Sequence, residues 1–267
     1  MMPDKKSKIN KTRYLKIVML LVVLCIIITY ISSKKETIYT LKQYDSKGNL
    51  SGTNEYIIRN GDTIMHGNFV NYNERGVKIA EGKFIDGHVN GVCKYYYNNG
   101  KIETQQFKKD KITLESINYD LNGLITNYIM CDNFGRWAFK ISFDNKGVTK
   151  YEGNPLLEIY KYKYKYAHKE QFKITEEQHL KVGGKLKYSY IVANIPNAKR
   201  SFKIENLGID NSKIKRTQKA VLPAQIDVQE VLIKKGKNTI RSIVSYKFND
   251  NVTPIFTDTL SFDVNVN

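Results

Sequence analysis

The chain has 267 residues, of which 41% are hydrophobic and 12% aromatic, with five Pro and three Cys. This much apolar surface can offset the chain entropy lost on folding, so the composition excludes a wholly disordered protein. Three cysteines exclude a small scaffold held together by disulfides. Lys and Arg number 43 against 26 Asp and Glu, a formal net charge of +17. The 19 Tyr exceed the 11 Phe and one Trp, which favours half-buried strands whose side chains keep a polar tip in water.

The positive charge is concentrated at the two ends of the chain. Residues 1–16 hold six basic residues and one acidic residue, a net charge of +5. Residues 32–153 hold 17 basic and 14 acidic residues, or +3, and residues 154–267 hold 20 and 11, or +9. The N-terminal tail and the C-terminal half are therefore basic, whereas the middle is nearly neutral.

Residues 17–31 form an uncharged apolar run, IVMLLVVLCIIITYI. A basic leader followed by such a run is typical of an export signal. Fifteen residues are slightly short for a full span, although a snorkelling Lys16 lengthens the segment. We therefore expect a transmembrane signal anchor at 17–31, a cytoplasmic tail at 1–16, and everything after Lys35 outside the cytoplasm of a single-pass cell-membrane protein. Cleavage near Ser33 would instead yield a secreted or periplasmic protein.

An aromatic residue four positions before a glycine recurs five times. Successive glycines lie 28, 24, 23 and 24 residues apart, and such a period marks a repeat architecture. Asp or Asn follows the aromatic residue in four of the five strings. We expect each string to form a hairpin turn, in which the Asx side chain caps the turn and the glycine takes a positive φ. The pairs are Tyr44/Gly48, Tyr72/Gly76, Tyr96/Gly100, Tyr119/Gly123 and Phe143/Gly147.

The segments between these turns alternate as strands do. In residues 137–144, the apolar side chains of Trp137, Phe139, Ile141 and Phe143 fall on one face. A single hairpin cannot bury its own apolar face, so several must lie edge to edge. Residues 38–153 are therefore predicted to form an antiparallel meander. In that meander Cys93 and Cys131 lie three strands apart, roughly 14 Å, which is beyond disulfide reach.

Two units between residues 66 and 111 share a pattern of glycine and aromatic residues. The pattern runs Gly67…Tyr72…Gly76, Phe84-Ile-Asp-Gly87, then Gly91…Tyr96…Gly100 and Phe107. It resembles the MORN-repeat proteins, in particular bacterial MORN-like proteins labelled as toxin–antitoxin-type antitoxins. The outer repeats match only in turn and period, since Tyr39, Leu114 and Ala138 stand at the motif glycine. The resemblance implies a sheet of hairpins that binds proteins or lipids, without implying a defined activity.

The repeat pattern ends at Gly153-Asn154-Pro155, which we take as a domain boundary. Residues 156–267 hold seven strand-like runs and no helix-period segment, so we expect a β-sandwich. The stretch 236–248, followed by 259–266, resembles the last two strands of bacterial immunoglobulin-like domains, although the region has neither Cys nor Trp. The predicted runs are 156–166, 172–174, 186–193, 201–204, 226–233, 239–248 and 259–266.

The sequence offers no recognisable catalytic or metal motif. None of the four histidines has a second ligand-type residue at helix or strand spacing, and no nucleophile elbow, phosphate-binding loop, zinc-protease motif or EF-hand loop occurs. We therefore expect no catalytic, cofactor-binding or metal-binding residues, no cofactor, and a protein that is not an enzyme. The histidines are His66, His88, His168 and His179.

Residues 159–166, with the sequence IYKYKYKY, alternate tyrosine and lysine. Aromatic and basic residues together can bind nucleic acid or another anionic polymer. A strand, however, puts the tyrosines on one face and the lysines on the other, so we favour a core role for the tyrosines and solvent exposure for the lysines. Export also argues against a nucleic-acid partner, whereas an anionic envelope polymer or a lipid headgroup stays open.

Taken together, these features predict an all-β protein with an N-terminal membrane helix, a MORN-like antiparallel hairpin sheet and an immunoglobulin-like sandwich. The predicted function is non-catalytic binding of a protein or envelope partner at the membrane. One alternative is an antitoxin- or immunity-type inhibitor of a toxin. A second alternative is an envelope enzyme whose site is assembled from scattered residues.

Overall fold

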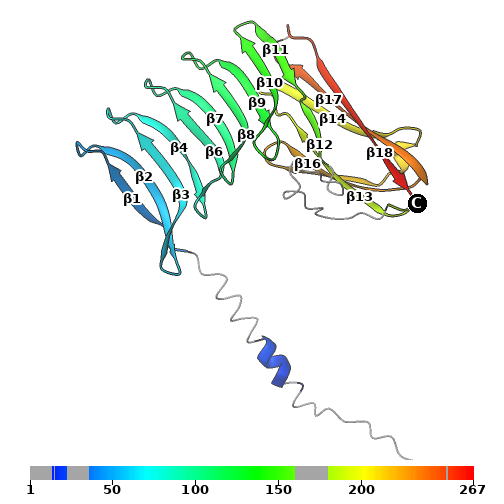
Figure 1. The fold of residues 1–267 in the computed structure, drawn as a ribbon, viewed down its shortest axis with the longest axis horizontal. Helices are drawn as coiled ribbons and strands as arrows, with labels where there is room; N and C mark the ends of the chain where they lie inside the picture. The colour runs from blue at the N-terminus through cyan, green and yellow to red at the C-terminus, as the bar shows by residue number, and fades with distance from the viewer. Residues whose placement is uncertain (1–13, 15, 23–35, 160–179, 251) are drawn as a thin grey trace, which may run out of the picture.

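The computed structural model describes residues 14, 16–22, 36–159, 180–250 and 252–267 (Figure 1). Their strands form one long antiparallel sheet and two smaller antiparallel sheets, which confirms the all-β prediction. Residues 14 and 16–22 are helical. Within the described ranges, no helix has both the length and the apolar character needed to span a membrane. Residues 23–31 of the predicted anchor lie outside the described residues.

The long sheet, referred to as the hairpin sheet, has eleven strands. From β1 to β11 each strand pairs with the next one along the chain, except that the short β5 pairs only with β4 and β4 continues to β6. In Figure 1 the strands follow one another as a curved single layer. The strands are β1 (Tyr39–Tyr44), β2 (Leu50–Arg59), β3 (Asp62–Tyr72), β4 (Lys78–Ile85), β5 (His88–Val89), β6 (Gly91–Tyr96), β7 (Ile102–Lys109), β8 (Ile112–Tyr119), β9 (Ile125–Cys131), β10 (Trp137–Asp144) and β11 (Gly147–Gly153).

The predicted hairpin turns are confirmed. In the first turn the Asp45 Oδ1 atom accepts hydrogen bonds from the backbone N–H groups of Lys47 (2.9 Å) and Asn49 (2.8 Å), and Gly48 has a φ of +84°. A further turn, missed by the sequence analysis, uses the same chemistry between Asp132 and Gly135. It escaped the pattern because a cysteine precedes Asp132 where the other turns have an aromatic residue. The predicted turn glycines all have positive φ: Gly48, Gly76, Gly100, Gly123 and Gly147.

The strand after each Asx–x–x–Gly turn carries one extra residue. The same holds for the turn in which Tyr97 stands at the Asx position. In the first hairpin Gln43 pairs with Gly52 and Tyr44 with Leu50, so Ser51 has no cross-strand partner. A bulge of this kind bends the strand that carries it and increases its twist, which accounts for the curvature of the hairpin sheet. The equivalent residues after the later turns are Ile79, Glu103, Thr126, Ala138 and Thr149.

The remaining strands form the predicted sandwich. The first of its sheets has the order β12-β13-β16-β15 and the second β14-β17-β18. Lettered A to G along the chain, these are sheets ABED and CFG, the strand order of constant-type immunoglobulin domains. The strands are β12 (Leu156–Ile159), β13 (Lys185–Val192), β14 (Ala198–Asn206), β15 (Arg216–Val221), β16 (Gln225–Val231), β17 (Gly236–Phe248) and β18 (Phe256–Val266).

The predicted runs from residue 186 onward coincide with β13, β14, β16, β17 and β18. In β18 the side chains of Phe262, Val264 and Val266 are buried and their neighbours exposed, as the alternation predicted. The strand β15 was not predicted, because its residues Arg216–Val221 are almost all exposed and lack an alternating pattern. The predicted run 172–174 and residues 160–166 of the run 156–166 lie outside the described residues.

A buried ion pair between neighbouring strands of one sheet, β15 and β16, is hydrogen-bonded to the other sheet of the sandwich. The Arg216 Nε atom donates a 2.7 Å hydrogen bond to Glu230, whose side chain is fully buried. Asn206, on the opposite sheet, donates to the other carboxylate oxygen of Glu230 at 3.0 Å, and the Tyr188 hydroxyl also donates to Glu230 at 3.0 Å. Asn206 therefore links this ion pair to the opposite sheet, in a region of the sequence that contains neither cysteine nor tryptophan.

The main hydrophobic core is continuous from the hairpin sheet into the sandwich. Tyr128, Met130, Phe139 and Ile141 of β9 and β10 belong to the same buried cluster as the sandwich residues. A smaller cluster lies further along the hairpin sheet and contains Phe69, Ala80 and Cys93. A Cβ atom on Gly82 would lie 2.7 Å from both the Cys93 Sγ atom and the Phe69 ring, so this cluster requires a glycine there.

The two described cysteines are both free thiols, Cys93 on β6 and Cys131 on β9. Their strands are three steps apart in the hairpin sheet, as predicted. Cys93 is buried, whereas Cys131 is only partly buried.

Replacing Gly100 by Val should lower the free energy of unfolding by about 1–3 kcal/mol, because its φ of +81° is strained for a β-branched residue. A Cβ atom at this position would have no atom within 4 Å, so the cost arises from the backbone alone. Gly100→Asn is the matched control, since Asn tolerates the left-handed conformation. Thermal unfolding should place Gly100→Val below Gly100→Asn, and equal midpoints would contradict the turn assignment.

Replacing Arg216 by Ala should cost about 3–5 kcal/mol, because it leaves the buried Glu230 carboxylate without its cation. The double variant Arg216→Met with Glu230→Leu should recover much of this loss, since it removes both charges. Arg241→Ala, which breaks a more exposed pair with Glu205, is the control and should cost at most about 1 kcal/mol. Urea unfolding measures all three, and equal losses at Arg216 and Arg241 would contradict the role of the buried pair.

Candidate functional site

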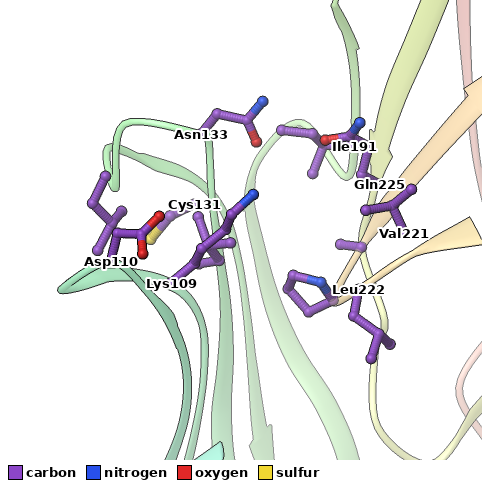
Figure 2. Close-up of a pocket in the computed structure, with 12 residues that line it drawn as sticks. Lys109, Asp110, Cys131, Asn133, Ile191, Val221, Leu222 and Gln225 are labelled. Atoms are coloured by element: carbon purple, nitrogen blue, oxygen red, sulfur yellow. The ribbon is translucent and has the colours of Figure 1, made fainter. Parts of the chain in front are cut away.

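A concave feature of the described residues lies where the hairpin sheet meets the sandwich. It consists of two hollows of about 290 Å³ and 300 Å³, which share Leu222 and Pro223 of the β15–β16 turn. We refer to the two hollows together as the junction cleft. In Figure 2, Asn133 and Lys109 of the hairpin sheet lie across the first hollow from Leu222 of the sandwich.

The first hollow combines apolar and polar side chains from both units. Lys109 and Asp110 come from the β7–β8 turn, and Asn133 comes from the β9–β10 turn. The Asp132 carboxylate accepts hydrogen bonds from two backbone N–H groups of its turn, which fixes the position of the neighbouring Asn133. Gln225 adds an amide from the sandwich. The apolar lining consists of Ile112, Leu114, Ile191, Val221, Leu222, Pro223 and Ala224.

The second hollow lies over the middle of the hairpin sheet. Its apolar residues are Val92, Phe107 and Ile117, and Val92 is 47% exposed. Cross-strand pairing sets Val92 opposite Phe107 and Phe107 opposite Glu115, so these side chains share one face of the sheet. Leu222, which borders both hollows, is 76% exposed. The polar lining consists of Gln105, Gln106, Glu115 and Asn194.

A hydrogen-bond network beside the cleft joins the two units. The Glu115 Oε1 atom accepts hydrogen bonds from the Tyr128 hydroxyl (2.5 Å) and the Asn194 side-chain amide (3.1 Å). The backbone N–H of Asn194 donates to the Tyr128 oxygen at 2.8 Å. Asn194 also donates to the Pro223 carbonyl at 2.6 Å and accepts from Arg200 at 2.6 Å. The network therefore positions the β15–β16 turn over the hairpin sheet.

The pKa values near the cleft are set mainly by burial. Desolvation raises the pKa of Glu115, although the hydrogen bonds from Tyr128 and Asn194 act in the opposite direction. Burial also raises the pKa of the Tyr128 hydroxyl well above its ordinary value, and the neighbouring Glu115 charge adds to that rise. Burial raises the pKa of the Cys131 thiol, with smaller contributions from Asp132 and Glu115. Cys131 is thus held as the thiol at neutral pH and is a poor nucleophile.

The chemistry of the junction cleft suits binding. Among the residues that line it, none pairs a nucleophile with a base at hydrogen-bond distance. Across the described ranges of the chain, no group of three or more His, Cys, Asp or Glu could hold a metal ion. An apolar lining with a few amides, one lysine and two carboxyl groups can accept a ligand that is partly apolar and partly polar.

Three residues named individually in the sequence-based predictions line this cleft, namely Phe107, Leu114 and Cys131; the two described histidines lie away from it. His66 is on the surface, with its Nδ1 atom 3.3 Å from the Asp86 carboxylate, and His88 is exposed on β5. His168, His179 and the tyrosines and lysines of 160–166 lie outside the described residues.

Glu115, Asn194 and Leu222 were not predicted as site residues from the sequence. Two signals for them exist in the sequence. Glu115 and Ile117 are two positions apart on a strand, so the carboxylate lies on the same face as an apolar side chain. The dipeptide Leu222-Pro223 marks a turn that begins with a large apolar side chain. Neither signal indicates that the two residues, more than 100 positions apart, border one cleft.

No protein-family model matches the chain, and no curated protein matches it either. Among solved structures, a crystal structure of TarM is similar at 11% identity with a TM-score of 0.22. A point mutant of TarM from S. aureus, in complex with Fondaparinux, alpha-GlcNAc-glycerol and UDP, is similar at 13% identity and a TM-score of 0.22. Each of these matches covers 47% of this chain and 21% of the other, so the chain spans about a fifth of TarM.

Domains 4 and 5 of the S-layer protein SbsC are similar at 9% identity with a TM-score of 0.23. That match covers 86% of this chain and 97% of the other. Likenesses with TM-scores this low carry no argument about the fold or function of this protein.

Replacing Glu115 by Gln should change how stability depends on pH. Because burial raises the pKa of Glu115, the folded protein holds this proton more tightly than the unfolded chain. Its contribution therefore makes the free energy of unfolding fall as pH rises from the ordinary glutamate pKa to the raised value, and then level off. The variant keeps an oxygen acceptor and loses this slope, so it should gain stability relative to wild type across that interval.

Glu152→Gln is the control for this experiment. A hydrogen bond from Lys150 lowers the pKa of the Glu152 carboxyl, so its contribution is lost as pH falls and the difference from wild type has the opposite sign. Urea unfolding of the three proteins over a pH series measures both effects. Parallel curves for wild type and Glu115→Gln would show that Glu115 titrates normally.

Proposed function

We propose that this protein is a non-catalytic binding protein, held at the extracytoplasmic face of a membrane by residues 17–31, and that the junction cleft receives a segment of a protein partner. The basic tail and the uncharged run of the sequence support the anchor and its orientation. The MORN-like pattern of residues 66–111 and the immunoglobulin-like strand order support a binding role, because both kinds of unit present surfaces to partners.

The observation that carries the proposal is the composition of the cleft. Leu222 and Pro223 border both hollows, and the Leu222 side chain is exposed between them. Exposed apolar side chains surrounded by polar groups are typical of the centres of protein interfaces. Each hollow, near 300 Å³, is at the small end of ligand pockets. Two small hollows fit an extended protein segment that places one apolar side chain in each.

The charges at the cleft agree with a protein segment rather than an anionic polymer. Lys109 is balanced by the adjacent Asp110, and the remaining polar groups are mostly amides. A polyanion site would need an excess of basic side chains. The amides of Gln225 and Asn133 can instead pair with the backbone of an extended segment, which offers both donors and acceptors.

Replacing Leu222 by Asp should abolish capture of the partner while leaving the fold intact, because the side chain is exposed and its loss creates no cavity. The full-length tagged protein, solubilised from membranes of the native host with a mild detergent, would be used to capture partners for mass spectrometry. Val252→Asp is the matched control, since Val252 is 75% exposed and lies outside both hollows.

A protein retained by wild type and Val252→Asp but lost with Leu222→Asp would support the proposed site. If that protein is toxic when produced alone, the binding function is that of an immunity-type inhibitor. Equal capture by all three proteins would mean that the cleft is not the binding surface.

A further inference from the structure

The two outer strands of the hairpin sheet have different surroundings. At one end, β11 is covered by the sandwich, since the Val148 N–H donates to the Thr253 hydroxyl at 3.3 Å and the Tyr151 ring stacks on Phe256 at 4.3 Å. At the other end, β1 pairs with β2 alone among the described strands. All six residues of β1 are exposed. Its outer row of backbone donors and acceptors therefore faces solvent within the described part of the chain.

The sequence of β1 does little to prevent pairing with another strand. Natural edge strands avoid such pairing with bulges, prolines or several charges. The bulge of this hairpin falls at Ser51 on β2, so the register along β1 itself is unbroken. The strand YTLKQY contains no proline or glycine and a single charge, on Lys42. Large apolar side chains at and beside it are exposed, with Ile38 at 54%, Leu41 at 40% and Tyr44 at 59%.

We propose that β1 is a dimerisation edge, which pairs antiparallel with β1 of a second copy of this chain around a two-fold axis at Leu41. Side chains paired across antiparallel strands lie on the same face. With the axis at Leu41, the two Leu41 side chains face each other, and Ile38 of each copy faces Tyr44 of the other. The pairing thus covers the exposed apolar residues of both strands and continues the ladder of the hairpin sheet across the axis.

The alternative registers are less favourable. An axis at Lys42 would set two ammonium groups directly opposite each other, and like charges in that position destabilise a sheet. An axis at Thr40 would set Ile38 opposite Lys42 and Tyr44 opposite Glu36. With the axis at Leu41, Lys42 faces the neutral Thr40 of the second copy. Charge and apolar matching therefore favour the axis at Leu41 over the axes at Thr40 and Lys42.

The dimer should be weak and dependent on concentration. A single pair of short strands buries less than the roughly 1,200 Å² of a standard stable interface. Because each copy offers the same edge, the contact closes on itself and does not propagate into a fibre. The proposed edge is separate from the junction cleft, which is lined by residues of β6 to β9 and their turns.

Cysteine cross-linking of the full-length protein in mild detergent tests the register. Paired residues in antiparallel strands have Cα atoms roughly 4.5–5.5 Å apart, within disulfide reach, so Leu41→Cys should shift the monomer band to a reducible dimer under mild oxidation. The two copies of Lys42 are diagonal neighbours roughly 7–8 Å apart, beyond disulfide reach. Lys42→Cys should therefore stay at the background set by the native cysteines of wild type. Equal cross-linking of both variants, or none of either, would overturn the proposal.

A second experiment does not use oxidation. Light scattering should detect a dimer of the wild type at high concentration. Leu41→Lys puts two charges at the axis, so it should abolish that dimer without moving the unfolding midpoint. Ile58→Lys is the matched control, because Ile58 is 53% exposed on β2 and is not on the edge. Loss of the dimer with Leu41→Lys alone supports the proposal. A monomeric wild type, or equal behaviour of the two variants, overturns it.

Discussion

The contact between the last hairpins and the sandwich is the constraint on which the rest of the structure depends. A single-layer sheet can bury one face only if something packs against it, and here the sandwich covers the face that bears Tyr128, Met130, Phe139 and Ile141. The Glu115 network then fixes the orientation of this contact, because its hydrogen bonds need defined directions while apolar packing does not. The junction cleft exists because the two units meet along part of this face and diverge beyond it.

The two halves stabilise themselves by different means. The sandwich has two apolar layers and adds a buried ion pair between Arg216 and Glu230 of one sheet. Asn206 of the other sheet donates a hydrogen bond to Glu230, which can select one packing of the sheets, since an alternative packing would remove a partner from a buried carboxylate. The hairpin sheet has only a small second cluster, around Phe69 and Cys93, and it relies on turns and on strand pairing. The stability of the hairpin sheet should therefore decrease with distance from the sandwich, toward the end of the sheet where β1 is exposed.

A binding function fits this distribution of stability. The walls of the junction cleft adjoin the continuous core through Ile117 of the hairpin sheet and Ile191 and Ala224 of the sandwich, which reduces the cost of ordering the site when a partner enters it. The exposed edge at β1 lies far along the sheet from the cleft, so dimerisation there would leave both clefts of a dimer open. Two such sites in one dimer would favour partners that are themselves dimeric or repetitive.

The sequence by itself determined the local features: the all-β class, the hairpin turns at Gly48, Gly76, Gly100 and Gly123, and the alternation of β18. These follow from interactions within a few residues, such as an Asx side chain that caps its own turn. The turn at Gly135 was missed only because Cys131 replaces the usual aromatic residue.

Only the tertiary structure decided which strands pair across the sandwich, the burial of Glu115 and Glu230, and the position of the cleft. Glu115, Asn194 and Leu222 meet because the sandwich packs on one face of a particular pair of hairpins, and that contact arises between residues distant in the chain. A carboxylate on a strand has the same local sequence whether its face is covered by water or by another sheet, so its environment is set by packing alone.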